Sequence, residues 1–244
     1  MTESSESRSS GIAMLDAVIF DVPDVRTPAA FWAELTGALT EQEESEGWLT
    51  LGTPDGWSIA FQPAPNLIPP QWPGQARPQQ LHLDLRVPDL AVETARAVGL
   101  GATLLRESES WNTLSDPAGH PFDLCLAEGN PGITVMGVTV DCPDSHALAE
   151  FWSALLGDPI TYDADGMAML GGAKPVLFQQ VDDYNAPAWP DPDRPQQLHL
   201  DLLVRDLDVG EASVLALGAT RLPGGGERFR VFADPAGHPF CLVS

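Results

Sequence analysis

The stretch Arg77-Pro-Gln-Gln-Leu-His-Leu-Asp-Leu85 decides the architecture, because it occurs a second time, unchanged, from Arg194 to Leu202. Extended to 27 residues, the two copies agree at 18 positions. The later stretch Asp116-Pro-Ala-Gly-His-Pro-Phe122 also recurs, as residues 234–240. The copies are 117 and 118 residues apart, which is far longer than the repeat unit of a solenoid. The pattern therefore predicts two duplicated domains in one chain.

The domain boundaries follow from the collinear repeat. We predict a first domain over residues 13–127 and a second over 134–244, joined by a linker at 128–133 that is rich in turn-forming residues. Residues 1–12 begin with MTESSESRSS. This polar composition predicts a short disordered tail.

The order of secondary structure can be read within the first copy. Ala17 to Val22 is apolar and predicts a strand, and a helix follows over Ala29 to Leu35. Short strands come next, and Leu81 to Val87 then begins the same strand–helix–strands order again. The pattern occurs twice in each copy. It indicates an α+β fold class.

Charge and cysteine content exclude several functions. The chain carries 12 basic and 35 acidic residues, a formal net charge of −23. Nucleic acids and anionic membranes both need a basic face, so we expect neither as a partner. No apolar run is long enough to span a bilayer. The three cysteines form no C-x-x-C pair, which favours a reducing, cytoplasmic location and buried, structural thiols.

These motifs together resemble the vicinal oxygen chelate superfamily, in its glyoxalase-like, bleomycin-resistance-related branch. The resemblance rests on a D-x-P-D…F-W opening, the L-H-L-D-L strand, a D-L…G-A helix and the D-P-A-G-H-P-F ending, all present twice. It implies two glyoxalase-like domains, each of two βαβββ modules whose curled, open, mixed sheet forms a cleft. It also implies that the two domains pair as other members pair in homodimers.

The resemblance implies a divalent metal ion in the cleft, held from the first, fourth, fifth and eighth strands. His82 and His199 match the fifth-strand position, whereas Ala17 and Gly137 at the first-strand position cannot ligate. The eighth strand offers Asp123 in one copy and Cys241 in the other, and the fourth strand offers only Gln62 and Gln179. We therefore expect at most an incomplete site at His82 and Asp123, with a possible single divalent metal.

The L-H-L-D-L strand carries the best catalytic candidates. His82 and Asp84 alternate with leucines, so they share one face of their strand, as do His199 and Asp201 in the second copy. His82 could be a ligand or general base and Asp84 its orienter, with His199 and Asp201 binding substrate. The alternative is a His–Asp hydrogen-bond network that only satisfies a half-buried strand.

Two further groups are candidates for binding substrate. Asp21 falls on the same side of the first strand as Ala17, and Asp141 falls on the same side as Gly137. From that side Asp21 could supplement His82 and Asp84. The alternative is that both aspartates are turn residues.

Trp72 with Arg77, and Trp189 with Arg194, lie in long proline-rich loops. The tryptophans could close over an apolar ligand or dock the loops, and the arginines could bind an anionic group or pair with acids. We expect His120 and His238, in turns, to face solvent.

Two functions from different classes remain open. The first is a resistance- or sequestration-like protein that binds a small, partly apolar organic molecule in one or two clefts. The second is a divalent-metal-dependent lyase, isomerase or dioxygenase with a single surviving site in the first domain. The sequence leaves open whether the protein is an enzyme. It also leaves open whether it is a monomer with pseudo-two-fold domain pairing or a homodimer.

Overall fold

A computed structural model describes residues 11–43, 47–191 and 195–244. Arg194 and nearly all of the expected tail lie outside these residues. The first copy comprises β1 (Met14–Val22), α1 (Arg26–Thr36), β2 (Leu39–Glu43), β3 (Leu49–Gly52), β4 (Ser58–Pro63), β5 (Leu81–Val87), α2 (Leu90–Leu100), β6 (Thr103–Arg106), β7 (Trp111–Ser115) and β8 (Pro121–Leu126).

The second copy repeats this order. It comprises β9 (Thr134–Cys142), α3 (Ser145–Leu156), β10 (Ile160–Ala164), β11 (Met167–Leu170), β12 (Val176–Gln180), β13 (Leu198–Leu203), α4 (Leu207–Leu217), β14 (Thr220–Arg221), β15 (Phe229–Ala233) and β16 (Pro239–Val243). Each copy is thus two successive βαβββ modules. The α+β class and the tandem glyoxalase-like architecture that the sequence predicts are confirmed.

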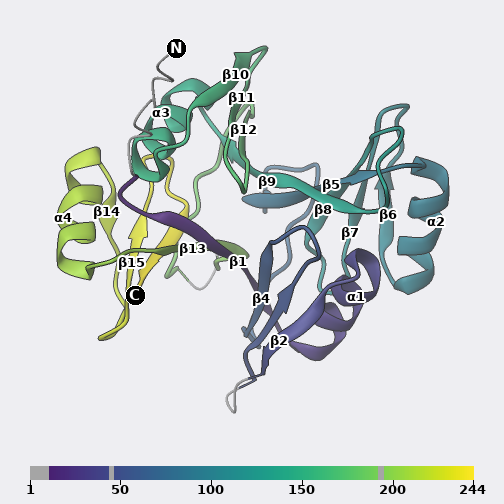
Figure 1. The fold of residues 1–244 in the computed structure, drawn as a ribbon, viewed down its shortest axis with the longest axis horizontal. Helices are drawn as coiled ribbons and strands as arrows, with labels where there is room; N and C mark the ends of the chain where they lie inside the picture. The colour runs from purple at the N-terminus through teal and green to yellow at the C-terminus, as the bar shows by residue number, and fades with distance from the viewer. Residues whose placement is uncertain (1–10, 44–46, 192–194) are drawn as a thin grey trace, which may run out of the picture.

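The two sheets are shared between the copies (Figure 1). Sheet A has the order β14-β15-β16-β13-β1-β4-β3-β2, and sheet B has the order β10-β11-β12-β9-β5-β8-β7-β6. The first module of one copy therefore continues the second module of the other. Antiparallel pairs β1–β13 and β5–β9 join them at the centre of each sheet. Each open, curled sheet consequently needs both halves of the repeat.

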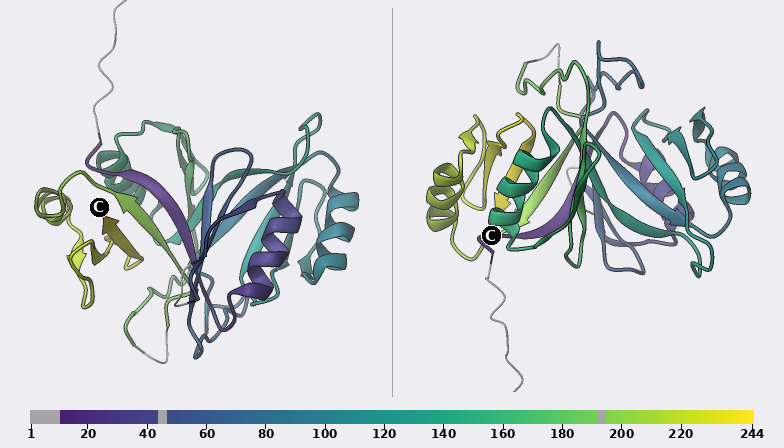
Figure 2. Two further views of the ribbon diagram at one scale, coloured as in Figure 1. Left: turned by 60° about the horizontal axis from the view of Figure 1, so that its bottom comes forward. Right: turned by 90° about the horizontal axis from the view of Figure 1, so that it is seen from above.

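Each copy nevertheless keeps its own aromatic core. In the first copy, the Trp32 ring on α1 packs against Phe20 of β1 and Phe122 of β8, with centroids 5.4 and 5.2 Å apart. In the second copy, Trp152 packs against Phe240 at 5.5 Å. Both indoles are buried. The helices cover the outer faces of the sheets (Figure 2), so the inner faces are left for polar residues.

No helix in the described ranges is long and apolar enough to cross a membrane.

Candidate functional site

The centre of each sheet brings the predicted residues of β5 and β13 opposite the first strand of the other copy. His82 pairs with Thr139 and Asp84 with Gly137 in sheet B. Residues that pair across a ladder have side chains on the same face. The neighbouring parallel strand then adds Asp123, which pairs with Asp84.

The carboxylate site, His82, Asp84 and Asp123, is the resulting cluster in sheet B. His82 Nε2 lies 3.6 Å from Asp84 Oδ1 and 4.0 Å from Asp123 Oδ2. The Thr139 hydroxyl donates a hydrogen bond to the other oxygen, Oδ2, of Asp84. Asp123 Oδ1 and His82 Nδ1 are buried without a hydrogen-bond partner in the described part of the chain. The site thus has unused polar atoms.

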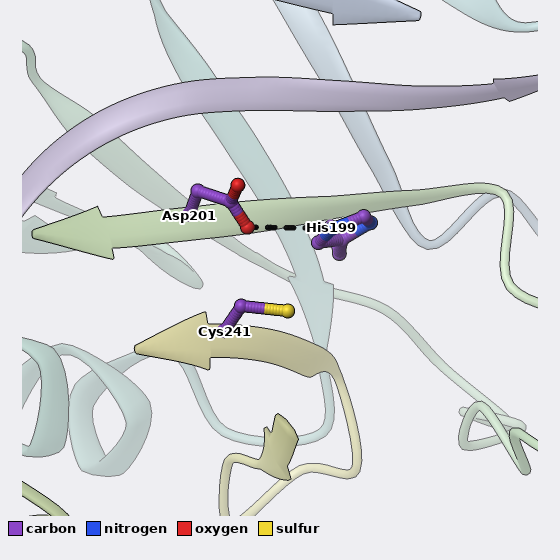
Figure 3. A group of neighbouring side chains, drawn as sticks. All are labelled: His199, Asp201 and Cys241. Carbon is purple, nitrogen blue, oxygen red and sulfur yellow. Dashed lines mark ion pairs between the residues drawn. The ribbon is translucent and has the colours of Figure 1, made fainter. Parts of the chain in front are cut away.

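The cysteine site, His199, Asp201 and Cys241, is its counterpart in sheet A (Figure 3). His199 Nε2 lies 3.4 Å from Asp201 Oδ1, and that oxygen has no hydrogen-bond partner among the described residues. Cys241 pairs with Asp201 in the β13–β16 ladder, as Asp123 pairs with Asp84. One carboxylate is therefore replaced by a thiol.

Amide side chains hold a further buried aspartate beside each site. Asp21 accepts hydrogen bonds from the side chains of Gln62 and Gln196. The Nε2 atom of Gln196 lies 3.0 Å from Asp21 Oδ1 and 2.9 Å from His199 Nδ1. In sheet B, Gln79 Nε2 lies 3.3 and 3.2 Å from the oxygens of Asp141. Gln79 and Gln196 are the third residues of the repeated R-P-Q-Q motif, a signal that the sequence contained without revealing its role.

The placement of Asp21 corrects one expectation. The sequence suggests that it supplements His82 and Asp84, but β1 lies in sheet A, so Asp21 accompanies His199 instead. Asp141 on β9 is the aspartate beside His82. Each trio therefore comes from a single copy, while the first strand of the other copy places a further aspartate beside it.

Burial and charge act against each other in both sites. Burial alone lowers the pKa of His82, but Asp84, Asp123 and Asp141 outweigh it and raise the pKa to about 9. Burial raises the pKa of Asp123 and Asp141 above the ordinary value. In sheet A, burial alone lowers the pKa of His199, and Asp201 raises it. Both histidines therefore sit where a positive charge is stabilised.

An open cavity of about 490 Å³, continuous with solvent, lies above the cysteine site. Its wall includes Trp48, which packs on Ala17, Ile19 and Ala60, and its rim includes Arg228 and Phe229. Sequence reasoning did not single out these three wall and rim residues. They lie at strand ends and in a hairpin, and only the curl of sheet A brings them over His199.

Within the described ranges, the predicted loop residues do not line the cavity above the cysteine site. Arg77 lines a smaller pocket between the β4–β5 and β12–β13 loops. Trp72 and Trp189 are half-buried and line neither cavity. A Cβ atom built on Gly224 would lie 3.5 Å from the Trp189 ring, so Trp189 docks its loop against the β14–β15 hairpin. This contact favours the docking alternative for Trp189.

The expectation that His120 and His238 face solvent is wrong. Their exposed fractions are 0% and 1%. Asp116 accepts hydrogen bonds from the backbone amide of His120 and from Trp32 Nε1, and Asp234 does the same for His238 and Trp152. The turn is folded under α1 and α3 by these contacts, which is why its histidine is enclosed.

The donor sets can be tested against a divalent metal ion. Ala17 and Gly137 pair with Asp201 and Asp84 and supply no ligand. Each site nevertheless presents three candidate ligand atoms within 4.8 Å of one another. The structure thus adds Asp84 to the expected pair His82 and Asp123. The unpartnered buried oxygens fit a cation, because buried carboxylate oxygens are normally satisfied.

This fold and these paired sites define a protein of the vicinal oxygen chelate superfamily. A sequence model described as "Glyoxalase-like domain" matches residues 17–125 and 137–243, so the chain belongs to that family. No curated protein sequence is significantly similar to it.

Similar solved structures agree on the fold. A mutant of glyoxalase I from Zea mays has 14% identity and a TM-score of 0.71, over 95% of this chain and 94% of its own. A "putative dioxygenase" from Bacillus subtilis has 13% identity and a TM-score of 0.64, over 96% and 85%.

Proposed function

We propose that the protein binds a small, partly apolar organic molecule in the cavity above the cysteine site. The observation that carries this proposal is the composition of that cavity. Its lining combines the polar side chains of His199, Asp201 and Gln62 with the aromatic rings of Trp48 and Phe229. Ligand sites typically combine apolar walls with a few convergent polar groups in this way.

The Arg228 side chain favours a ligand that carries a negative group. It is exposed at the rim, and the structure pairs it with no acid in the described residues, although the chain has 35 acids. Other arginines of sheet A are paired, as Arg230 is with Glu211. An unpaired guanidinium beside an aromatic wall suits an apolar anion.

Anilinonaphthalene sulfonate, an aromatic anion, is a direct probe of this proposal. We expect its fluorescence to rise on binding, and Arg228→Gln to weaken its affinity about fivefold, which corresponds to roughly 1 kcal/mol. Arg205→Gln is the matched control, because Arg205 is also exposed and does not line the cavity. No binding, or equal loss in both variants, would contradict the proposal.

A second candidate is divalent-metal-dependent chemistry at the carboxylate site. The specific observation is the trio His82, Asp84 and Asp123 together with the unpartnered Asp123 Oδ1. A bound cation there would polarise an oxygen of the substrate. The hydrogen bond from Thr139 holds Asp84 with one oxygen toward His82, the orienting contact that metal ligands commonly have.

Elemental analysis after incubation with Mn²⁺, Fe²⁺, Ni²⁺ and Zn²⁺ tests this second candidate. We expect His82→Ala to lose one equivalent of metal, whereas His146→Ala, at an exposed histidine on α3, should lose none. Unchanged metal content in His82→Ala would rule out the carboxylate site as the metal's location.

A further inference from the structure

The two sites differ in how the ring of their histidine is held. In the cysteine site, Gln196 Nε2 lies 2.9 Å from His199 Nδ1. In the carboxylate site, the equivalent Gln79 contacts Asp141, and His82 Nδ1 is buried without a hydrogen-bond partner in the described ranges. Among the described residues, a side chain therefore holds Nδ1 only in sheet A.

The hydrogen bonds of Gln196 place the ring proton of His199 on Nε2. A carboxylate only accepts hydrogen bonds, so the Gln196 atom that lies 3.0 Å from Asp21 Oδ1 is the amide nitrogen. The same nitrogen faces His199 Nδ1 and donates its second hydrogen there. Nδ1 therefore accepts, and Nε2 carries the proton of the neutral ring. A protonated Nε2 has no lone pair for a metal ion, but it can donate a hydrogen bond.

The cavity presents this donor beside an acceptor. His199 and Asp201 both line the cavity, and His199 Nε2 lies 3.4 Å from Asp201 Oδ1. That oxygen has no hydrogen-bond partner in the described part of the chain. Burial raises the pKa of the Cys241 thiol, so the thiol stays uncharged at neutral pH. The cysteine site thus offers one N–H donor and one carboxylate acceptor.

We infer that the cavity recognises a carboxamide-type group, such as that of an aromatic amide or lactam. Its carbonyl oxygen accepts from His199 Nε2, and its adjacent N–H donates to the Asp201 carboxylate. The rings of Trp48 and Phe229 contact the apolar part of the ligand, and Arg228 remains available to an anionic substituent. This inference rests on the proposed function and names the chemical class of its ligand.

Two matched ligands, 2-naphthamide and methyl 2-naphthoate, test the inference by isothermal titration calorimetry. They share the aromatic rings and the carbonyl group, but only the amide has an N–H to donate. We expect the amide to bind at least about tenfold more tightly, because a site built for a hydrogen bond rejects the analogue that leaves its polar group unpaired. Asp201→Leu removes the acceptor and should abolish this preference. Equal affinities in the wild-type chain, or a preference that persists in Asp201→Leu, would overturn the inference.

Nitrogen-15 NMR of the histidine rings tests the positioning role of Gln196 without any ligand. We expect a protonated Nε2 and an unprotonated Nδ1 at His199 at neutral pH. Gln196→Glu offers Nδ1 an acceptor and should protonate it, whereas Gln79→Glu, the matched change in the other copy, should leave the signals of His199 unchanged. Circular dichroism checks that each variant is folded. A protonated Nδ1 in the wild-type chain, or an unchanged ring in Gln196→Glu, would overturn this assignment of the proton.

Failure of this inference can be told from failure of the proposed function. If anilinonaphthalene sulfonate binds and depends on Arg228, but the amide is not preferred over the ester, only the carboxamide class is wrong. If neither the dye nor either naphthalene ligand binds, the cavity is not a binding site and both proposals are wrong.

Discussion

The carboxylate site and the cysteine site occupy equivalent backbone positions, but they are stabilised differently. Asp84 is held by Thr139, whereas the residue opposite His199 is Ile19, which has no hydroxyl to offer Asp201. Conversely, Gln196 bridges His199 and Asp21 in the cysteine site. Duplication therefore preserved the scaffold, while single side chains made the two clefts chemically distinct.

The largest effect should come from a feature that the two halves share. Asp116 accepts hydrogen bonds from Trp32 Nε1 and two backbone amides, and Asp234 makes the same contacts. We expect Asp116→Asn and Asp234→Asn each to lower the free energy of unfolding by about 2–4 kcal/mol, measured with urea. If only one variant were destabilised, the turns would not be equivalent.

The pH dependence of the free energy of unfolding checks the role of Asp116. Burial alone would raise the pKa of Asp116, but His120 and the hydrogen bonds lower it below 3.8. A carboxyl group with a lowered pKa stabilises the fold above its ordinary pKa and loses that contribution as pH falls. The wild-type chain should therefore lose stability below about pH 4, and Asp116→Asn should lose less over that range.

The next effect separates the two sites. Thr139→Val removes the hydroxyl that donates to Asp84 Oδ2 and keeps the side-chain shape. We expect it to lower the free energy of unfolding by about 1–3 kcal/mol, the cost of a buried acceptor left unsatisfied. Ile19→Val, at the equivalent position of sheet A, should cost only about 0.5–1.5 kcal/mol. Equal losses would mean that the hydroxyl contributes nothing specific.

Features of the fold and the sites could be predicted from the sequence where they depend on residues close together in the chain. The repeat and the alternation of His82 with Asp84 are local patterns, so the fold and the shared face of these residues followed from the sequence. Asp21 was assigned to the wrong neighbours because the pairing of β1 with β13 spans most of the chain. The repeat aligns Cys241 with Asp123, but only the β13–β16 ladder places its thiol beside Asp201.

Replacing a buried aspartate beside either site with the neutral asparagine should increase the stability of the protein. Burial raises the pKa of both Asp141 and Asp21, so their charged forms cost stability at neutral pH. Asp141→Asn should stabilise the protein by about 0.5–2 kcal/mol at pH 7. The gain should vanish in acid, because a raised folded pKa contributes stability at low pH that is lost as pH rises.

The matched variant sharpens this comparison. Asp21 has two glutamine donors and Asp141 one, so Asp21→Asn should stabilise less. Thermal unfolding at pH 4 and pH 7 measures both. A loss of stability in Asp141→Asn at pH 7 would show that Gln79 compensates the buried charge completely.

The smallest effect concerns the turn histidines, whose Nε2 atoms differ in a loop contact. The Tyr184 hydroxyl lies 2.9 Å from the Ala236 carbonyl oxygen and 3.1 Å from His238 Nε2, whereas His120 Nε2 has no partner in the described residues. Tyr184→Phe leaves His238 Nε2 without this partner, a state that His120 Nε2 already tolerates. We therefore expect a loss of only about 1 kcal/mol in urea unfolding, the net value of a typical hydrogen bond. A loss above about 3 kcal/mol would mean that Tyr184 fastens the whole β12–β13 loop rather than one histidine.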